Sequence, residues 1–216
     1  MIEPVALQIR SQSCWLSPAR CLFWEENKTL VASGFQLGRM AGPETASSER
    51  SSLDRLQEQI LFFKAERILL LGGFTLPENN RYLDEFMDWR SRFSSLLFTC
   101  VLPKSSPIIE SLLGKIEIGI QLDELTDGPF RWVASQVAAE KGEARRPTEF
   151  MISGYQDPGY KRFDAPRQAA GTPCFFLTPN HALLPAFSKP KGADLVKPGK
   201  DQLVWLCNSD TLERKT

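Results

Sequence analysis

The chain has 216 residues and a mass of 24.3 kDa, which suits one domain over residues 1–216 with a sizeable core. Its 26 Lys and Arg residues balance 26 Asp and Glu residues, so net charge gives no attraction to nucleic acid or to an anionic membrane. Its five cysteines are odd in number and never spaced as Cys-x-x-Cys, a pattern typical of neither a disulfide framework nor a zinc site. The N-terminus lacks the apolar core of a signal peptide, and no apolar run approaches the roughly 20 residues of a bilayer span. We therefore expect a cytoplasmic protein without membrane contact.

The first half of the chain alternates apolar runs with segments of helical periodicity. In order, we expect a strand within 5–9, a hairpin with strands 22–24 and 30–32, a helix over 52–64, a buried strand over 67–71, a helix capped by Asn80, and a buried strand over 96–102. A β-α-β-α-β order of this kind predicts a parallel sheet with right-handed crossover connections.

The second half is mostly β in character. Two antiparallel strands, 116–122 and 130–135, are expected to flank a turn at 126–129. Further short strands are expected over 149–153, 174–177, 182–186 and 203–207. No linker is long enough to separate two domains. We therefore expect an α/β fold in which two mixed sheets pack face to face with helices outside.

Four segments carry a resemblance to a known family: CLFW at 21–24, TLVA at 29–32, PCFF at 173–176 and LLPAF at 183–187. Together they resemble the ligase-associated DNA-damage-response endonucleases, a bacterial branch of the calcineurin-like metallophosphoesterases. The resemblance extends over most of the chain. It implies the four-layer α-β-β-α sandwich of the metallophosphoesterases, with two mixed sheets flanked by helices.

The same resemblance implies a set of metal-ligand positions that this chain has lost. The family holds two divalent cations, such as manganese, through Asp and His side chains at strand ends. The corresponding positions here are Gly34, Gln36, Gly73, Lys104, Ser105, Tyr155 and Asp157. Only Asp157 carries a carboxylate, and the single His of the chain, His181, is expected to be a turn residue. One carboxylate does not hold two cations, so we expect no metal, no cofactor and no catalytic residue.

The expected function is therefore that of a catalytically inactive phosphoesterase, a pseudoenzyme with a binding or assembly role. In the family's setting this role belongs to DNA repair, with a DNA ligase, a helicase-like protein and a nuclease as partners; contact with nucleic acid and the oligomeric state are left open. A first alternative is a metal-independent phosphodiesterase or nuclease, with Asp157 as base and Lys104 and Arg39 as an electrostatic clamp. A second is a sensor that binds an anion or a nucleotide in the vacated cleft. The candidate ligand-binding residues are Gln36, Arg39, Lys104, Tyr155, Asp157 and Arg162.

Overall fold

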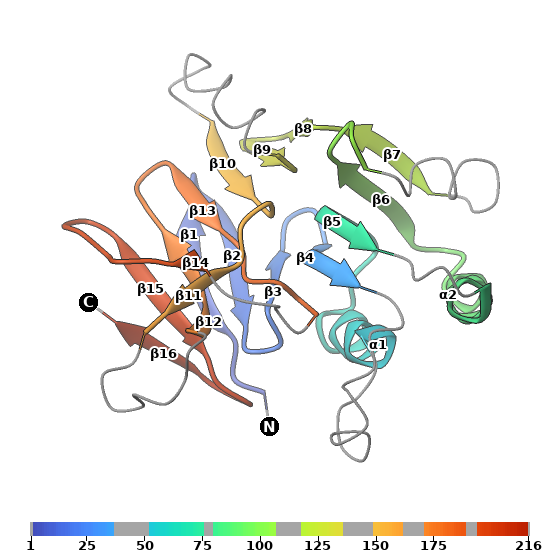
Figure 1. The fold of residues 1–216 in the computed structure, drawn as a ribbon, viewed down its shortest axis with the longest axis horizontal. Helices are drawn as coiled ribbons and strands as arrows, with labels where there is room; N and C mark the ends of the chain where they lie inside the picture. The colour runs from blue at the N-terminus through green and yellow to red at the C-terminus, as the bar shows by residue number, and fades with distance from the viewer. Residues whose placement is uncertain are drawn as a thin grey trace.

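The structure, a computed structural model, describes residues 2–36, 52–75, 80–106, 118–135, 149–161, 171–188 and 194–215. Within these ranges the chain forms two mixed β-sheets and two α-helices (Figure 1). The expected ligand-binding residues Arg39 and Arg162 lie outside the described residues.

The first sheet has seven strands in the order β1-β2-β3-β4-β5-β6-β7. These are β1 (Val5–Ile9), β2 (Gln12–Ser17), β3 (Cys21–Trp24), β4 (Thr29–Gln36), β5 (Arg67–Thr75), β6 (Leu97–Leu102) and β7 (Gly119–Leu122). The strands β1 to β4 run antiparallel to one another, whereas β4 to β7 are parallel. The expected hairpin is confirmed as β3 and β4, and so is the parallel arrangement of the β-α-β-α-β segment.

Two helices form the crossovers of this parallel part. They are α1 (Ser52–Phe63), between β4 and β5, and α2 (Asn80–Arg92), between β5 and β6. No helix among the described residues has both the length and the apolar character needed to cross a bilayer.

The second sheet has nine strands. Seven follow the order β14-β11-β12-β13-β10-β9-β8, while β15 pairs with β12 and β16 with β15. They are β8 (Glu124–Asp127), β9 (Phe130–Val133), β10 (Phe150–Ser153), β11 (Pro158–Tyr160), β12 (Thr172–Leu177), β13 (His181–Leu183), β14 (Asp194–Leu195), β15 (Leu203–Cys207) and β16 (Leu212–Lys215). The short strands β2, β11, β14 and β16 were not expected from the sequence.

The core lies on both faces of the first sheet. On one face, Leu56 of α1 and Phe86 and Trp89 of α2 pack against alternate residues of the strands, such as Leu70. On the other face, the intervening residues, such as Leu71, pack against the second sheet. This alternation follows from the two-residue side-chain period of a strand. The described residues thus show two packed sheets and one helical layer; the second outer helical layer of the expected sandwich is not among them.

One strand pairing differs from the expectation. The expected strand over 116–122 was placed opposite 130–135 across the turn, but β7 joins the first sheet beside β6. The partner of β9 is instead β8, with Asp127 opposite Phe130 across a turn that contains Gly128 at a positive φ of 57°. A two-residue turn can pair only the residues directly before it, and 116–122 lies too far upstream. The chain changes sheet at Asp123, whose φ of 66° lies in the left-handed region.

Candidate functional site

The carboxyl ends of β4 and β10 meet at one edge of the two sheets, and Ser33 joins them. The Ser33 carbonyl accepts a hydrogen bond from the Phe187 amide at 2.6 Å, and Ser33 forms a parallel bridge with Ala186. The Ser33 hydroxyl donates to the Gly154 carbonyl at 3.2 Å, and its side chain is fully buried. Three segments that are distant in sequence are therefore fixed against one another near the ends of their strands, where open α/β sheets bind ligands.

Gly34 lies in the irregularity of the β4–β5 ladder at this edge. Its φ of 57° is one that side chains adopt reluctantly. A Cβ atom at Gly34 would lie 3.1 Å from the Ala186 Cβ and 3.6 Å from Asp157 Oδ1. The structure thus brings two of the expected positions, Gly34 and Asp157, next to each other.

Gly73 is exposed and belongs to the same edge. A Cβ atom at Gly73 would meet nothing within 4 Å, whereas its neighbour Gly72 packs directly against Gly154. The position that the resemblance assigns to a bridging carboxylate therefore has room for a side chain, although it carries none.

Asp157 supplies the acidic group of this edge. Its burial, and then the negative charge of Asp194, raise the pKa of Asp157 above its ordinary value, while Arg20 acts in the opposite direction. Asp194 is held close because its amide donates to the Asp157 carbonyl at 2.7 Å. The local field therefore disfavours the carboxylate form of Asp157.

Gln36 ends β4 and is held through its backbone. Its amide donates to the Ser188 hydroxyl oxygen at 2.8 Å, and the same hydroxyl lies 2.9 Å from the Ser52 hydroxyl at the start of α1. Ser188 is buried, so this bond ties the end of β4 to the segment after β13 and to α1.

Lys104 and Ser105 follow β6 and are both exposed. The Lys104 amide donates to Asp123 Oδ1 at 3.1 Å, and its ammonium lies 3.4 Å from Asp123 Oδ2. The charge of Lys104 is therefore engaged by a carboxylate at the β7–β8 junction. The described residues show no contact between Lys104 and Gln36 or Asp157.

The two tyrosines near Asp157 pack in different places. Tyr155 lies against Val133 and Met151 of the second sheet, while Tyr160 packs with a separate cluster that contains Cys174 and Val204. The two rings therefore belong to separate packing clusters.

His181 is not the turn residue expected from the sequence but the first residue of β13. Its Nε2 lies 2.7 Å from the hydroxyl of Ser153, which is fully buried at the end of β10. Burial lowers the pKa of His181 from 6.5 to about 4, so the ring is neutral at pH 7. The one sequence signal for a strand is the apolar run Ala182-Leu183-Leu184, which directly follows His181.

The residues at this edge do not fit a pair of divalent cations. Such a pair needs several carboxylate and imidazole ligands, and the expected positions provide one carboxylate, Asp157. No three His, Cys, Asp or Glu side chains gather as metal ligands within the described ranges. The buried thiols are equally unsuited to chemistry, since burial raises the pKa of Cys14, Cys21, Cys100 and Cys174 to about 12.

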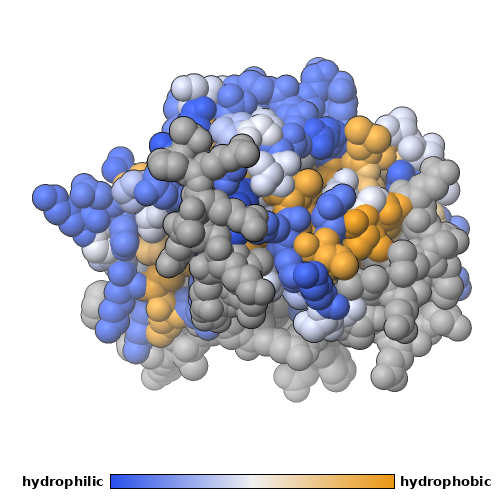
Figure 2. All heavy atoms as spheres, turned by 90° about the horizontal axis from the view of Figure 1, so that it is seen from above, coloured by the Kyte–Doolittle hydropathy of each residue, from blue (hydrophilic) through white to orange (hydrophobic). Residues whose placement is uncertain are grey.

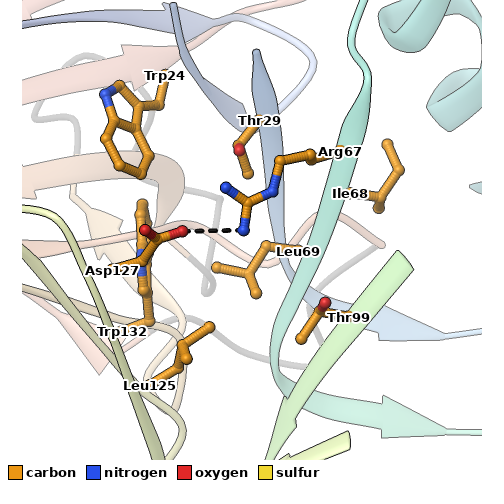
Figure 3. Close-up of a pocket in the computed structure, with 9 residues that line it drawn as sticks. All are labelled: Trp24, Thr29, Arg67, Ile68, Leu69, Thr99, Leu125, Asp127 and Trp132. Carbon is orange, nitrogen blue, oxygen red and sulfur yellow. Dashed lines mark ion pairs between the residues drawn. The ribbon is translucent and has the colours of Figure 1, made fainter. Parts of the chain in front are cut away.

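A small cavity lies at the opposite end of the strands, between the sheets (Figure 3). Trp24 and Trp132 form one wall, and Arg67 reaches across to Asp127 with 2.9 Å between Nη2 and Oδ2. Asn27 also donates to Asp127, at 3.1 Å. The cavity volume of about 10 Å³ holds about one water molecule, so it does not admit a larger ligand.

Large exposed apolar side chains come from several elements of the molecule. Figure 2 shows apolar groups gathered among polar ones on the face seen from above. The large exposed apolar residues that the structure describes are Leu61 and Phe62 of α1, Leu97 of β6, Leu122 of β7 and Leu195 of β14. They come from four different elements, and single exposed apolar residues are ordinary on protein surfaces.

Comparison with known proteins identifies the fold. No family model matches the chain, and no curated protein matches it. The crystal structure of the Pseudomonas putida nuclease MPE is similar to this chain with a TM-score of 0.79 and 18% sequence identity, covering 99% of this chain and 100% of that one. The chain therefore has the fold of that nuclease, consistent with the metallophosphoesterase-type nuclease fold that the resemblance implies.

Proposed function

We propose that this chain is a pseudoenzyme of the metallophosphoesterase fold, which has lost phosphodiester cleavage and acts by binding or assembly. One observation carries the proposal. Gly34 and Asp157 lie together at the edge where β4 and β10 end, and Asp157 is the one acidic side chain among the expected positions Gly34, Gly73 and Asp157.

Metal-assisted hydrolysis generates hydroxide at neutral pH and neutralises the charge that develops on the phosphoryl oxygens. Gly34 and Gly73 supply neither a metal ligand nor a charge. Burial raises the pKa of Asp157, so the carboxylate form of this residue is disfavoured. The proposed function therefore does not include phosphodiester cleavage.

The finer parts of the proposal rest on the resemblance and on the likeness to a nuclease fold. They are a single domain over 1–216, the full four-layer sandwich, a place in the cytoplasm of a bacterium, and a role in DNA repair beside a ligase, a helicase-like protein and a nuclease.

The first experiment is a DNA cleavage assay of the pure protein with manganese, on single-stranded and nicked duplex DNA. We expect no cleavage above that of a chelator control. Manganese-dependent cleavage that copurifies with the protein and is lost in Asp157→Asn would overturn the proposal.

Neither alternative gains a specific observation from the described residues. The metal-independent clamp needs Lys104 near Asp157, whereas Lys104 pairs with Asp123. An anion sensor needs positive charge at the Gly34 turn, where the nearest side chains are those of Ala186 and the acidic Asp157. Arg39, the other expected cation, lies outside the described residues.

A further inference from the structure

Ser153 and His181 connect two strands beside the candidate site. They lie on the parallel neighbours β10 and β13, and the Ser153 hydroxyl is 2.7 Å from His181 Nε2. The backbone supports the same pairing, because the Leu184 amide donates to the Ser153 carbonyl at 3.0 Å. The hydroxyl is fully buried, so the imidazole is its hydrogen-bond partner in place of water.

The residue after Ser153 forms the junction of the two sheets. Gly154 accepts the hydrogen bond of Ser33, and a Cβ atom at Gly154 would lie 2.7 Å from the Leu71 carbonyl oxygen. The turn then continues to Asp157 beside Gly34. Any change that loosens the end of β10 therefore acts directly on the candidate site.

We propose that the Ser153–His181 pair is an acid-sensitive latch, whose protonation releases the end of β10 and the turn over 154–157. With the ring proton on Nδ1, the neutral imidazole accepts a hydrogen bond from the Ser153 hydroxyl at Nε2, whereas an imidazolium donates from both nitrogens, so this hydrogen bond must reverse its direction. After protonation, the buried Ser153 hydroxyl must direct its own proton to another acceptor, while a positive charge forms on the half-buried ring beside it. Both changes favour an open arrangement, in which Ser153 and His181 have separated and the end of β10 is released.

The charged groups beside the imidazole on the neighbouring strands do not offset the free-energy cost of protonating His181. Across the sheet, His181, Met151 and Arg131 lie side by side on β13, β10 and β9, and Arg131 is paired with Glu124 at 2.9 Å. On the other side, β12 presents uncharged residues such as Leu177 opposite Ala182.

Asn180 and Tyr155 are also poor partners for a cation. Asn180, which precedes His181, accepts a hydrogen bond from Arg10 at 2.7 Å. Tyr155, after β10, packs against Met151 and Val133. Burial is the cause of the lowered pKa of His181, to about 4.

The direction of the effect follows from proton linkage. The ring takes up a proton near pH 6.5 when it is exposed but only near pH 4 when the latch is closed. Between these values the open form binds more protons, so the opening constant rises by up to about tenfold for each unit by which the pH falls. Above about pH 6.5 the effect disappears. The latch is thus closed at neutral pH and opens on acidification.

This inference rests on the proposed function only for what the turn over 154–157 binds, and its test uses the chain of 216 residues without a ligand. Amide hydrogen exchange is measured at Gly154 and Leu184 between pH 7 and 4.5, with the intrinsic pH dependence divided out and Val204 of β15 as reference. We expect the opening constants of Gly154 and Leu184 to rise about tenfold per pH unit below pH 6.5, and the reference to rise less. The matched variant His181→Gln keeps a hydrogen-bonding side chain that does not titrate, and its opening should not depend on pH. Equal pH dependence in both proteins would contradict the latch.

A second measurement keeps the test decisive if the variant does not fold. His181 is the only His of the chain, so its ring signals in the wild-type NMR spectrum need no assignment. We expect the ring of the folded protein to titrate near pH 4. Titration near 6.5 with the fold intact would overturn the latch, without bearing on whether the site has lost its phosphoesterase chemistry.

Discussion

Gly72 and Gly154 touch through their backbones at the meeting point of the two sheets. A Cβ atom at Gly72 would collide with the carbonyl oxygen of Gly154 and lie 2.7 Å from its carbonyl carbon. Gly72 also has a φ of 83°, a left-handed conformation that residues with a side chain rarely adopt. The close approach of β5 to β10 thus requires glycine at both positions.

Gly72→Ala should therefore be strongly destabilising, because it adds backbone strain and a collision with backbone atoms that cannot move aside. We expect the free energy of unfolding to fall by about 3 kcal/mol or more. The matched control is Gly73→Ala, where the new methyl group meets nothing, and its effect should stay within about 1 kcal/mol. Urea denaturation followed by far-UV circular dichroism measures both. Similar losses in the two variants would show that the sheets are not in contact here.

Asp157→Asn should stabilise the protein at neutral pH. The folded state raises the pKa of Asp157 through burial and the charge of Asp194, so folding disfavours the carboxylate. The stability contributed by the protonated group is fully present below the unfolded value of 3.8 and is lost as the pH rises through the folded value. The melting temperature of the variant should exceed that of the wild type at pH 7, and the difference should vanish near pH 3.5. A variant that is less stable at pH 7 would mean that the charge is favourably paired.

Ser188→Ala should destabilise the protein because it leaves the Gln36 amide without its partner. The buried hydroxyl also bonds Ser52, so one substitution removes the tie between β4 and α1. We expect a loss of about 1–3 kcal/mol in the free energy of unfolding. Ser105→Ala, at an exposed turn position, serves as the control and should change stability by less than about 0.5 kcal/mol. Equal effects would contradict the role of Ser188.

The ion pair between Arg67 and Asp127 should contribute little, although it joins the two sheets beside the cavity (Figure 3). Both side chains are about one-third exposed, so water and salt screen the interaction. A double-mutant cycle with Arg67→Met and Asp127→Asn should give a coupling energy of about 1 kcal/mol or less at low salt, and less at 0.5 M salt. A coupling of several kcal/mol that salt does not weaken would contradict the exposed character of the pair.

Much of the fold could be predicted from the sequence because local patterns and the resemblance agree. The apolar run 67–71 and the helical stripe of 52–64 appear as β5 and α1, and the parallel order of β4, β5 and β6 follows from them. The position of β7 could not be predicted in this way. The choice between the two sheets depends on long-range packing, which periodicity within 116–122 does not encode.

The candidate site was only partly accessible to sequence reasoning. The resemblance identified Gly34 and Asp157 as positions at one site, and the structure places them in contact range. It gave no sign that Lys104 pairs with Asp123 or that Ser153 bonds His181, because each partner comes from a different element. Hydrogen bonds between strands depend on register, and a single sequence does not specify register between residues that are 28 positions apart.

The most direct test of the central claim is a calorimetric titration of chelator-treated protein with manganese at pH 7.5. Among the expected ligand positions only Asp157 carries a carboxylate, and its pKa is raised, so we expect no saturable heat of binding up to millimolar manganese. Asp157→Asn should give the same flat titration as the wild type. Tight binding of two manganese ions per chain would contradict the account, because it would require a set of ligands that Gly34, Gly73 and Asp157 do not provide.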